Sequence, residues 1–430
     1  MVATSDDRHL NHIERSGSSR PDILRIATLY GANGHGKTNV VRAISALKRL
    51  VTDQKWSIPK FKLNSSMREM PTRMVIEFRH NTNDYEYGVA INGKIVSEEW
   101  LFLTNSHGKE EKIFERVSEK IEGTKDYKTN ISSGKSLKKI NSPVENIIMD
   151  KYLEILSAGL KETRPFLSEA ADREFPVLGD AFKWISFILT PVEATSSYAP
   201  LFERMGGDEA FRAFLEGFMT RCDVGISSLR AKSSKVDPSV LIKMPESLKN
   251  QIDLLEKNEI IGIESDDGVS MVFAKNEDDD IVVKNIEAIR NDSDGKEIEF
   301  SFDEESSGTR RLLDLAPMLA DEEDQRVYIV DELDRKLHPL LSYQFVQEFL
   351  SKKRKSQLIL TTHNTHLMDL ELLRRDEIWF VQKKPDGSSE LYSLAEMKIR
   401  PDLNVKKGYI SGRFGAIPFL GHFPSMEESI

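Results

Sequence analysis

A glycine-rich stretch near the start of the chain has the residue types and the spacing to hold a phosphate. Residues 26–38 read Ile-Ala-Thr-Leu-Tyr-Gly-Ala-Asn-Gly-His-Gly-Lys-Thr, an apolar run followed by G-x-x-x-x-G-K-T. In this pattern the glycines let successive backbone N–H groups point at a phosphate, the lysine ammonium reaches the β and γ phosphates, and the threonine hydroxyl ligates Mg²⁺. The implied ligands are ATP and Mg²⁺, and the candidate binding residues are Gly31, Asn33, Gly34, Gly36, Lys37 and Thr38.

The elements on both sides of this loop also fit phosphate binding. Residues 26–30 are strand-like, and the apolar residues within 38–50 are spaced for one face of a helix. A helix that starts at the loop directs the positive end of its dipole toward the phosphate. A glycine-containing turn can match the motif by chance, but strand, loop and helix occur here together, which favours a P-loop.

Two neighbouring acids follow a second apolar run. Residues 327–330, Val-Tyr-Ile-Val, predict a buried strand, and Asp331 and Glu332 come directly after it. There Asp331 would bind Mg²⁺ through its water shell, and Glu332 would activate the attacking water. Acids after a strand are common, so the motif is weak alone. A further strand-like run at 357–360 leads to His363, and because parallel strands deliver their carboxyl ends to one nucleotide, we expect these side chains beside the P-loop.

A third candidate site precedes the acids. Ser306, Ser307 and Gly308 open a helix-like stretch, and hydroxyls with a bare glycine amide at a helix N-terminus make an anion site. An ordinary helix cap is the alternative. Since the P-loop already approaches the nucleotide from one side, a second anion site is most useful against the γ-phosphate of a nucleotide held by another copy of the chain.

The overall composition excludes a general attraction to nucleic acid. The chain has 430 residues, of which 30% are charged, with a formal net charge of −10 and a pI near 5.6. The length predicts about two to four domains. Any DNA or RNA contact must therefore be local. Basic clusters at Lys135–Lys139 and Lys352–Lys355 are candidates, although a solvated surface accounts for them as well.

Cysteine usage and hydropathy indicate the compartment. Cys222 is the single cysteine, so the chain has no internal disulfide and no Cys-based zinc site of its own. No apolar run approaches the roughly 18 residues of a membrane helix, and the first residues lack the apolar core of a signal peptide. We expect a cytoplasmic protein that is neither secreted nor membrane-spanning.

Strand and helix signals change along the chain. Residues 1–22 are polar and predict a loop or a frayed end. Short β-prone runs with Asn- and Gly-containing turns predict an antiparallel meander between about 72 and 118, and the Lys-, Ser- and Gly-rich stretch 119–143 predicts an exposed, mobile connection. Helical periodicity covers 143 to about 229 and 245–257, without sustained heptads, so we expect a compact helical lobe.

The predicted domains are an N-terminal half of the nucleotide-binding unit at 1–142, a helical insertion lobe at 143–260 and a C-terminal half at 261–430. Strand-like runs at 268–275, 281–286 and 297–302 open the last part. Within the lobe one apolar stripe fits plain core better than a docking surface, and its residues are Phe211, Phe214, Leu215 and Phe218.

In this order the motifs resemble the ABC-type ATPase head that SMC-type, RecF-like and OLD-family proteins share. Four segments carry this resemblance: the P-loop, Ser-Ser-Gly before a helix, Asp-Glu-Leu-Asp-Arg-Lys-Leu-His-Pro at 331–339, and Thr-Thr-His-Asn at 361–364. Tail segments at 374–381 and 412–419 narrow the resemblance to AAA-family ATPases of bacterial abortive-infection and anti-phage systems, of the AbiL and RloA kind. The resemblance implies an α/β P-loop NTPase head with a mixed sheet, an antiparallel meander and a helical insertion.

The resemblance also implies roles for single residues. Ser306, Ser307 and Gly308 would form a signature motif that acts across a homodimer or a higher even-numbered homo-oligomer. Glu332 would be the catalytic base, and His363 the switch histidine that senses the γ-phosphate. Arg335–His338 would correspond to the D-loop, although His338 is equally well a helix-start residue before Pro339. His366 fits a structural role better than a catalytic one.

The chain departs from the family pattern at two places. No glutamine occurs between Gln54 and Gln251, so the Q-loop glutamine, a second Mg²⁺ ligand, is absent. Heads of this kind also usually begin with a β-hairpin before the P-loop strand, and we expect this segment to be missing here.

Three functions are compatible with these motifs. The first is a nucleotide-gated dimeric ATPase that acts as sensor or scaffold in phage defence and controls a separate effector, a Toprim or RloB-like nuclease. The second is a RecF- or SMC-like DNA-repair ATPase that clamps DNA when ATP is bound. The third, a self-sufficient OLD-type nuclease, needs a Toprim domain after the ATPase, and residues 364–430 are too few for one.

Overall fold

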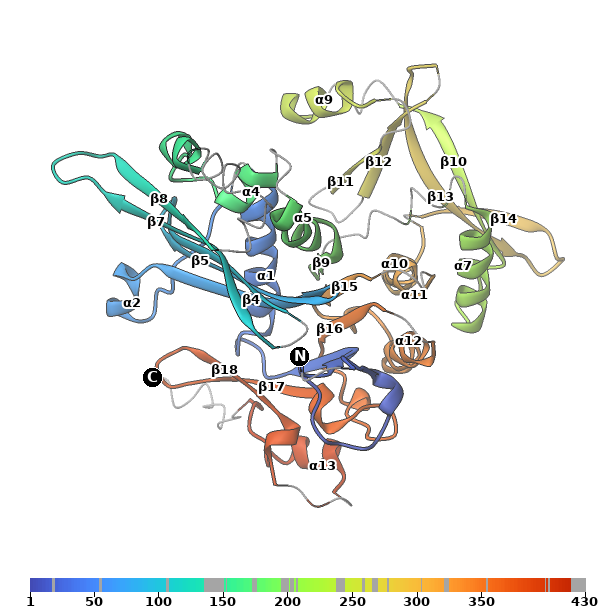
Figure 1. Cartoon of the computed structure of the whole chain (residues 1–430). Helices are drawn as coiled ribbons and strands as arrows, with labels where there is room; N and C mark the ends of the chain where they lie inside the picture. The colour runs from blue at the N-terminus through green and yellow to red at the C-terminus, as the bar shows by residue number, and fades with distance from the viewer. Residues whose placement is uncertain are drawn as a thin grey trace, which may run out of the picture.

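The central sheet of the computed structural model carries the nucleotide motifs (Figure 1). Its strand order is β18-β17-β3-β16-β15-β9, with β18 antiparallel to five parallel strands. Alternate residues of β15 enter two cores, because helices cover both faces: Ile329 packs with α1, and Val330 packs with α12. The strands are β3 Ile26–Tyr30, β9 Leu189–Val192, β15 Val327–Val330, β16 Gln357–Thr361, β17 Ile378–Lys383 and β18 Ser389–Ser393.

Helices flank this sheet. Those closest to the nucleotide motifs are α1 Lys37–Thr52, α10 Ser307–Leu315, α11 Pro317–Ala320 and α12 Pro339–Ser351. The structure describes residues 1–17, 20–53, 56–105, 108–134, 151, 153–171, 176–194, 201, 205, 208–236, 244–256, 260–264, 270–276, 278–302, 304–320, 325–352, 355–398, 400 and 403–418. The mixed α/β class predicted from the sequence is confirmed.

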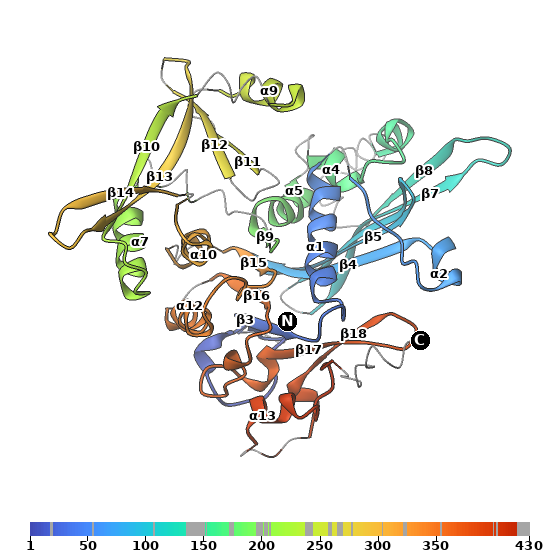
Figure 2. The ribbon, with the colours of Figure 1, turned by 180° about the vertical axis from the view of Figure 1, so that it is seen from behind.

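The predicted meander is a five-stranded antiparallel sheet in chain order, which lies beside α1 (Figures 1 and 2). The fifth strand, β8, falls in the stretch 119–143 that was expected to be an exposed connection, so that prediction is wrong for its residues. Strand β8 was not predicted because its sequence is polar, as is usual for an edge strand. Its Thr129 pairs with Ser118 of β7, and the two hydroxyls lie 2.9 Å apart. The strands are β4 Thr72–His80, β5 Asn83–Asn92, β6 Ile95–Thr104, β7 Glu110–Lys120 and β8 Tyr127–Ser133.

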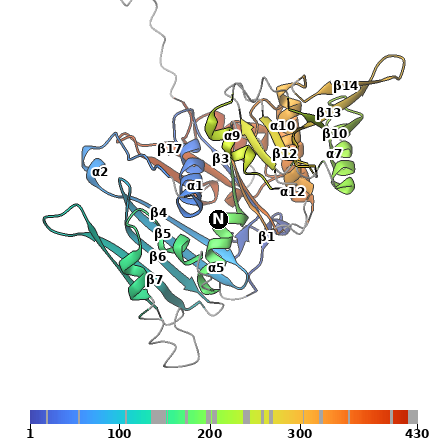
Figure 3. The ribbon, with the colours of Figure 1, turned by 90° about the horizontal axis from the view of Figure 1, so that it is seen from above.

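A second antiparallel sheet lies on the other side of the central sheet (Figure 3). Its order is β10-β13-β12-β11, and β14 also pairs with β13. The strand-like runs predicted after residue 268 correspond to three of these strands. The strands are β10 Ser228–Lys235, β11 Ile260–Glu264, β12 Ser270–Lys275, β13 Ile281–Asn291 and β14 Glu297–Ser301.

The stretch 143–260 contributes to both sides of the molecule. Helices α4 Phe166–Ala171 and α5 Pro176–Lys183 pack with the meander, whereas α7 Glu209–Arg221 packs with α10 and α11. The same stretch carries β9 and β10, which helical periodicity did not predict. Of its apolar stripe, Phe211, Leu215 and Phe218 are buried, which agrees with plain core.

The N-terminal residues are held against the central sheet, so the expectation of a frayed end is wrong. Short strands β1 Ile13–Glu14 and β2 Ile23–Leu24 pair antiparallel before β3. The fully buried Arg374 donates to the carbonyl oxygens of Thr4, Asp6 and Arg8. Because these contacts come from residues far away in the sequence, local polarity could not reveal them.

The tail segments that narrowed the resemblance are structural. Arg374 and Asp376 form a buried ion pair, and Asp376 accepts hydrogen bonds from the amide and hydroxyl of Thr4. Further on, the Tyr392 hydroxyl donates to the Phe414 carbonyl at 2.6 Å, which folds the chain after α13 Val405–Ile410 back onto β17. Of the two segments, Phe419 lies outside the described residues.

Candidate nucleotide-binding site

The glycine-rich loop joins the end of β3 to the start of α1. Gly36 caps α1 with φ 106°, a conformation that side chains rarely adopt, and a Cβ there would also collide with Ser389 of β18. Gly31 has no such backbone strain, but a Cβ would lie 2.5 Å from the Val381 carbonyl oxygen. The neighbouring hairpin β17–β18 therefore requires glycine at both ends of the loop.

Lys37 is the first residue of α1 and is only 6% exposed. Its ammonium donates to the carbonyl oxygens of Gly31 at 2.7 Å and Ala32 at 3.4 Å, so it bends back over the loop. Burial lowers the pKa of Lys37, and the nearby carboxylates of Glu332 and Asp331 oppose that effect. The P-loop lysine is thus a partly desolvated cation beside the predicted acids.

Asp331 and Thr38 meet at the carboxyl edge of the sheet. Asp331 follows β15 and is 2% exposed, and its Oδ1 accepts from the Thr38 hydroxyl at 3.4 Å. The same oxygen accepts from the Thr361 hydroxyl at 2.6 Å. Because β16 lies between β3 and β15 in the sheet, Thr361 at its end reaches both neighbours. The two predicted metal ligands are brought together, and Thr361 is a site residue that the sequence analysis missed.

Glu332 adopts a left-handed backbone conformation with φ 45°. Its N–H donates to the Thr361 hydroxyl at 2.8 Å, and the next N–H, of Leu333, donates to the Thr361 carbonyl at 3.0 Å. A non-glycine residue in this region costs about 1–3 kcal/mol and persists only where surrounding contacts hold it. These two hydrogen bonds to Thr361 hold the backbone of Glu332 in its left-handed conformation, and this conformation sets the position of the Glu332 side chain.

His363 stands at the carboxyl end of the neighbouring strand, as predicted. The backbone N–H of His363 donates to the Asp334 carboxylate, and both carboxylate oxygens lie 3.3 Å from the backbone nitrogen. Partial burial and the Lys37 ammonium lower the pKa of His363, against the opposing effect of Asp334, Glu332 and Asp331. A neutral imidazole therefore faces the same space as the lysine and the acids.

The Ser-Ser-Gly segment opens α10, and its first serine is the helix cap. The Ser306 hydroxyl accepts from the Thr309 N–H at 3.1 Å. A Cβ on Gly308 would lie 2.7 Å from the carbonyl oxygen of Lys336, so the helix start packs on the D-loop segment of its own chain. In Figures 1 and 2, α10 and α1 lie on either side of β9 and β15. The signature segment is thus separate from the P-loop of the same chain.

Arg311, one turn further along α10, is a second residue that the sequence analysis missed. It is 6% exposed, and its Nη2 donates to the main-chain oxygen of Asp331 at 3.3 Å. Its Nε is buried and has no hydrogen-bond partner among the described residues. The sequence does contain a signal for Arg311, because it lies among the apolar residues of a predicted helix. An arginine on the buried side of a helix usually has a specific hydrogen-bond acceptor.

Two histidines near the site have local roles. His338 caps α12, and its Nδ1 accepts from the Leu340 N–H at 3.3 Å, as the helix-start alternative predicted. His366 lies in a short 3₁₀ helix, Thr365–Leu367, that Asn364 caps. Asn364 also donates to Ser342 of α12 at 2.7 Å, which fixes the loop after His363.

The carboxyl end of the edge strand β9 lies next to that of β15. Strand β9 pairs in parallel with β15, and the Asp331 N–H donates to the carbonyl of Val192, the last residue of β9. Glu193 follows directly and forms an ion pair with Arg49 of α1 at 3.6 Å. The Glu193 side chain is therefore directed toward α1 at the end of the edge strand.

In the described part of the chain, no group of three His, Cys, Asp or Glu side chains gathers in a way that could hold a metal ion. None of the helices within the ranges given above is long and apolar enough to cross a membrane.

Comparisons with known proteins place the chain in a family. No curated protein matches. Among solved structures, a head domain titled "SmcHead bound to the C-winged helix domain of ScpA" is 16% identical, covering 88% of this chain and 94% of that one, with TM-score 0.34. The SMC head domain from Thermotoga maritima is 13% identical, covering 89% and 96%, with TM-score 0.32.

A family model gives the stronger result. It is described as "AAA domain, putative AbiEii toxin, Type IV TA system", and it matches residues 26–144 and 228–369. The match includes the P-loop, the Ser-Ser-Gly segment, both acids and His363. More than half of the chain is covered, so the protein belongs to this AbiEii-type family of P-loop ATPases.

Proposed function

We propose that the protein binds and hydrolyses ATP at the site formed by the P-loop, Asp331, Glu332 and His363. One observation carries this proposal: the ends of three neighbouring strands bring a phosphate-binding lysine, two acids and a histidine to the same edge of the sheet. These side chains are close enough to change one another's pKa. Burial lowers the pKa of Lys37 and the two acids raise it, while Lys37 lowers the pKa of His363.

The P-loop would bind the phosphates. Its backbone N–H groups would donate to the phosphates at the start of α1, and the helix dipole would add positive potential. The Lys37 ammonium, which donates to the Gly31 carbonyl, would exchange this partner for phosphate oxygens. A partly desolvated ammonium gains more from such a contact than a solvated one.

The residues present fit Mg²⁺. Mg²⁺ keeps several waters and takes few protein oxygens beside substrate phosphates. The Thr38 hydroxyl and the Asp331 carboxylate supply such oxygens and already lie within 3.4 Å of each other. When bound, the ion neutralises phosphate charge. Thr361 keeps Asp331 oriented, because its hydroxyl donates to Oδ1.

Glu332 is the proposed general base, as the resemblance implies. Its backbone is fixed by Thr361, so its carboxylate projects from a rigid turn rather than from a mobile loop. His363 would contact the γ-phosphate as a neutral imidazole, which donates one hydrogen bond without adding a buried charge.

Two copies of the chain would complete the site. Ser306, Ser307 and Gly308 present a helix N-terminus that lies away from α1 of the same chain. We therefore propose that this segment meets the nucleotide of a partner in a homodimer or a higher even-numbered homo-oligomer. Gly308 packs on Lys336, so the partner would contact the signature and D-loop segments together.

In the cell, this ATPase would be the sensor or scaffold of an anti-phage system of the AbiL and RloA kind. It would pass its nucleotide state to a separate effector, a Toprim or RloB-like nuclease. The family description, which names a toxin of a type IV system, supports a role in defence. A RecF-like repair ATPase is the second candidate, but the basic cluster at Lys135–Lys139 lies outside the described residues.

The test uses the purified chain with Mg²⁺ and ATP. Calorimetry should show ATP binding that Lys37→Ala abolishes and Lys48→Ala retains, because the Lys48 ammonium donates to the Leu189 carbonyl at the start of β9, whereas the P-loop follows the other end of β3. Equal binding by wild type and Lys37→Ala would contradict the P-loop assignment. The same protein should not cleave plasmid, single-stranded DNA or tRNA. Cleavage that a point mutation in this chain removes would contradict the separate effector.

A further inference from the structure

Lys336, in the D-loop segment, has a backbone conformation that lysine rarely adopts. Its φ is 63°, and it lies at the third position of a tight turn, which the Leu337 N–H closes by donating to the Asp334 carbonyl at 3.0 Å. A turn with a positive φ at this position favours glycine or asparagine. Strained residues of this kind cluster at functional sites. The backbone alone therefore favours glycine at 336, and the lysine side chain needs a separate reason.

The turn is held from two sides. The carboxylate of Asp334, its first residue, accepts from the backbone N–H of His363 at 3.3 Å. The carbonyl oxygen of Lys336 lies against Gly308, where a Cβ would be only 2.7 Å away. The backbone of Lys336 is therefore fixed between the end of β16 and the signature segment of α10.

The ammonium of Lys336 is not neutralised by its own chain. The side chain is exposed, and it has no hydrogen bond and no ion pair with any residue that the structure describes. The two described acids before the signature serines are engaged elsewhere. Glu305 pairs with Arg290 at 2.6 Å, and Glu304 accepts from the Ser301 N–H at 2.8 Å. A free positive charge therefore stands next to the signature segment.

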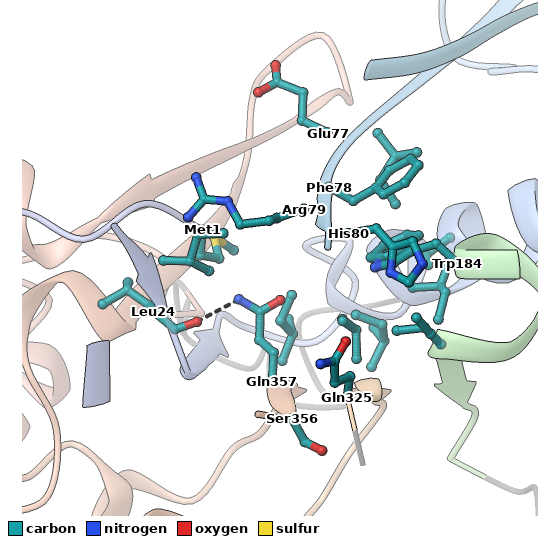
Figure 4. A pocket seen from close by; sticks show the side chains of 18 of the residues that line it. Met1, Leu24, Glu77, Phe78, Arg79, His80, Trp184, Gln325, Ser356 and Gln357 are labelled. Carbon is teal, nitrogen blue, oxygen red and sulfur yellow. Dashed lines mark hydrogen bonds between the residues drawn. The ribbon is translucent and has the colours of Figure 1, made fainter. Parts of the chain in front are cut away.

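The cations around the largest cavity show the contrast. This cavity lies at the edge of β4 and at the first residues of β15 and β16 (Figure 4). Arg79 pairs there with Asp84 at 2.6 Å, and Arg25 donates to the Lys352 carbonyl at 2.7 Å. Their own chain already supplies these cations with partners, whereas Lys336 has none among the same described residues.

The nucleotide site of a single chain is short of positive charge. Besides burial, the charges that set the pKa of His363 are those of Lys37, Asp334, Glu332 and Asp331. One ammonium against three carboxylates gives a formal charge of −2. Mg²⁺ and ATP together are also an anion, so their binding adds negative charge. In phosphoryl transfer, a cation from a second molecule can stabilise the charge of the transferring group.

We propose that the Lys336 ammonium contacts the phosphates of the nucleotide that the partner chain holds. This inference rests on the proposed function, in which the signature segment of one chain meets the nucleotide of another. Because the Lys336 backbone packs on Gly308, a nucleotide that approaches the signature segment also approaches this ammonium. Lys336 is then a catalytic residue supplied in trans, and its fixed backbone lowers the entropy that is lost when the contact forms.

The first test compares single variants in ATP hydrolysis. Lys336→Gln removes the charge, so kcat should fall by about tenfold or more, whereas ATP affinity in calorimetry should change by less than about threefold, because the P-loop is untouched. Lys336→Arg keeps the cation and should lose less than about threefold in kcat. Lys407→Gln is the matched control, since Lys407 is an exposed lysine of α13, and it should leave kcat unchanged.

Lys336→Gly separates the side chain from the backbone. Glycine adopts a φ of 63° without strain, so the midpoint of thermal unfolding should stay equal or rise. At the same time kcat should fall as it does in Lys336→Gln. A lower midpoint with a normal kcat would show that the lysine serves the fold of its own chain, and this would overturn the proposal.

Mixed chains decide whether Lys336 acts on its own nucleotide or on that of the partner. A dimer of Lys336→Gln and Lys37→Ala chains contains one site with an intact P-loop and an intact Lys336. An equimolar mixture should therefore reach about a quarter of the wild-type rate. Lys336→Gln mixed with Ser307→Arg should stay at the rate of the parents, because both changes affect the same half of the shared site.

Two results would overturn the proposal. Recovery with Ser307→Arg but not with Lys37→Ala would place Lys336 at the nucleotide of its own chain, and a wild-type kcat in Lys336→Gln would remove it from the reaction. The mixture of Lys37→Ala with Ser307→Arg is the reference. If this mixture recovers activity, the shared site stands whatever Lys336 does. If it does not, the shared site fails, and this inference fails with it.

Discussion

The guanidinium of Arg311 donates a hydrogen bond to the main-chain oxygen of Asp331, with 3.3 Å between Nη2 and that oxygen. The peptide bond that contains this oxygen also contains the N–H of Glu332, which donates to the Thr361 hydroxyl at 2.8 Å. Arg311 of α10 and Thr361 of β16 therefore bind the C=O and the N–H of the peptide bond that joins Asp331 to Glu332. A movement of the signature helix would rotate this unit and shift Glu332.

Replacement of Arg311 by Met should slow ATP hydrolysis more than it weakens ATP binding. We expect kcat to fall by about tenfold or more, while ATP affinity stays within about twofold, because the P-loop is untouched. Arg311→Lys should recover part of the rate, since a cation can still reach the carbonyl. Steady-state kinetics and calorimetry measure both quantities, and a loss of affinity equal to the loss of rate would argue for a purely structural role.

Thr361→Val and Arg311→Met should not be additive. Each variant releases one end of the same peptide unit, so the second release changes little once the first has occurred. Thr361→Val alone should lower the free energy of unfolding by about 1–3 kcal/mol, because it leaves the Glu332 N–H unpaired and removes a donor from Asp331. Denaturant unfolding and kcat of the single and double variants provide the cycle, and strict additivity would refute the shared unit.

Glu332→Gln should retain ATP and lose hydrolysis. The amide preserves the shape of the side chain but cannot accept a proton, so we expect turnover to fall by about a hundredfold or more. The variant should accumulate as an ATP-bound oligomer in size-exclusion chromatography. If Glu332→Gln turns over ATP as fast as the wild type, another residue must be the general base. Asp334, next to His363, is the first alternative.

A mixture of Lys37→Ala and Ser307→Arg chains should recover activity that neither parent has. A mixed dimer contains one site with an intact P-loop and an intact signature, so an equimolar mixture should reach about a quarter of the wild-type rate. Ser307 is preferable to Gly308, because a side chain at 308 would also displace Lys336 in its own chain.

The control for this mixture combines Lys37→Ala with Glu332→Gln. Both residues belong to the same chain's site, as the contribution of Glu332 to the pKa of Lys37 indicates, so no intact site forms in the mixed dimer. Recovery in the control, or failure of the Ser307→Arg mixture at every ratio, would contradict a site shared between two chains.

His363 should titrate below its ordinary pKa of 6.5 in the ATP-free protein. Partial burial and Lys37 disfavour the imidazolium, so the unfolded chain binds this proton more readily, and stability should fall as the pH drops below 6.5. Proton NMR of the imidazole measures the pKa. Lys37→Ala should raise it, whereas Lys48→Ala should leave it unchanged. A normal pKa in the wild type would exclude the coupling.

The sequence by itself determined the nucleotide motifs, because each is a local pattern. A P-loop is recognisable from residues a few positions apart, and the strand before it and the helix after it follow from the same short stretch. The acids after β15 and the histidine after β16 were also found, since parallel strands place consecutive carboxyl ends together. The meander was predicted from alternation and turn residues, which are equally local.

Only the tertiary structure decided the contacts between distant segments. Thr361 and Arg311 have ordinary sequence surroundings, and their importance arises because β16 and α10 approach one peptide unit. The strands β1 and β2 have only two residues each and are too short to predict, and the edge strand β8 is too polar. Partners such as Arg374 hold the N-terminal segment from the far end of the chain. Such contacts could not be predicted, because hydrogen bonding and burial depend on neighbours in space, which a sequence does not list.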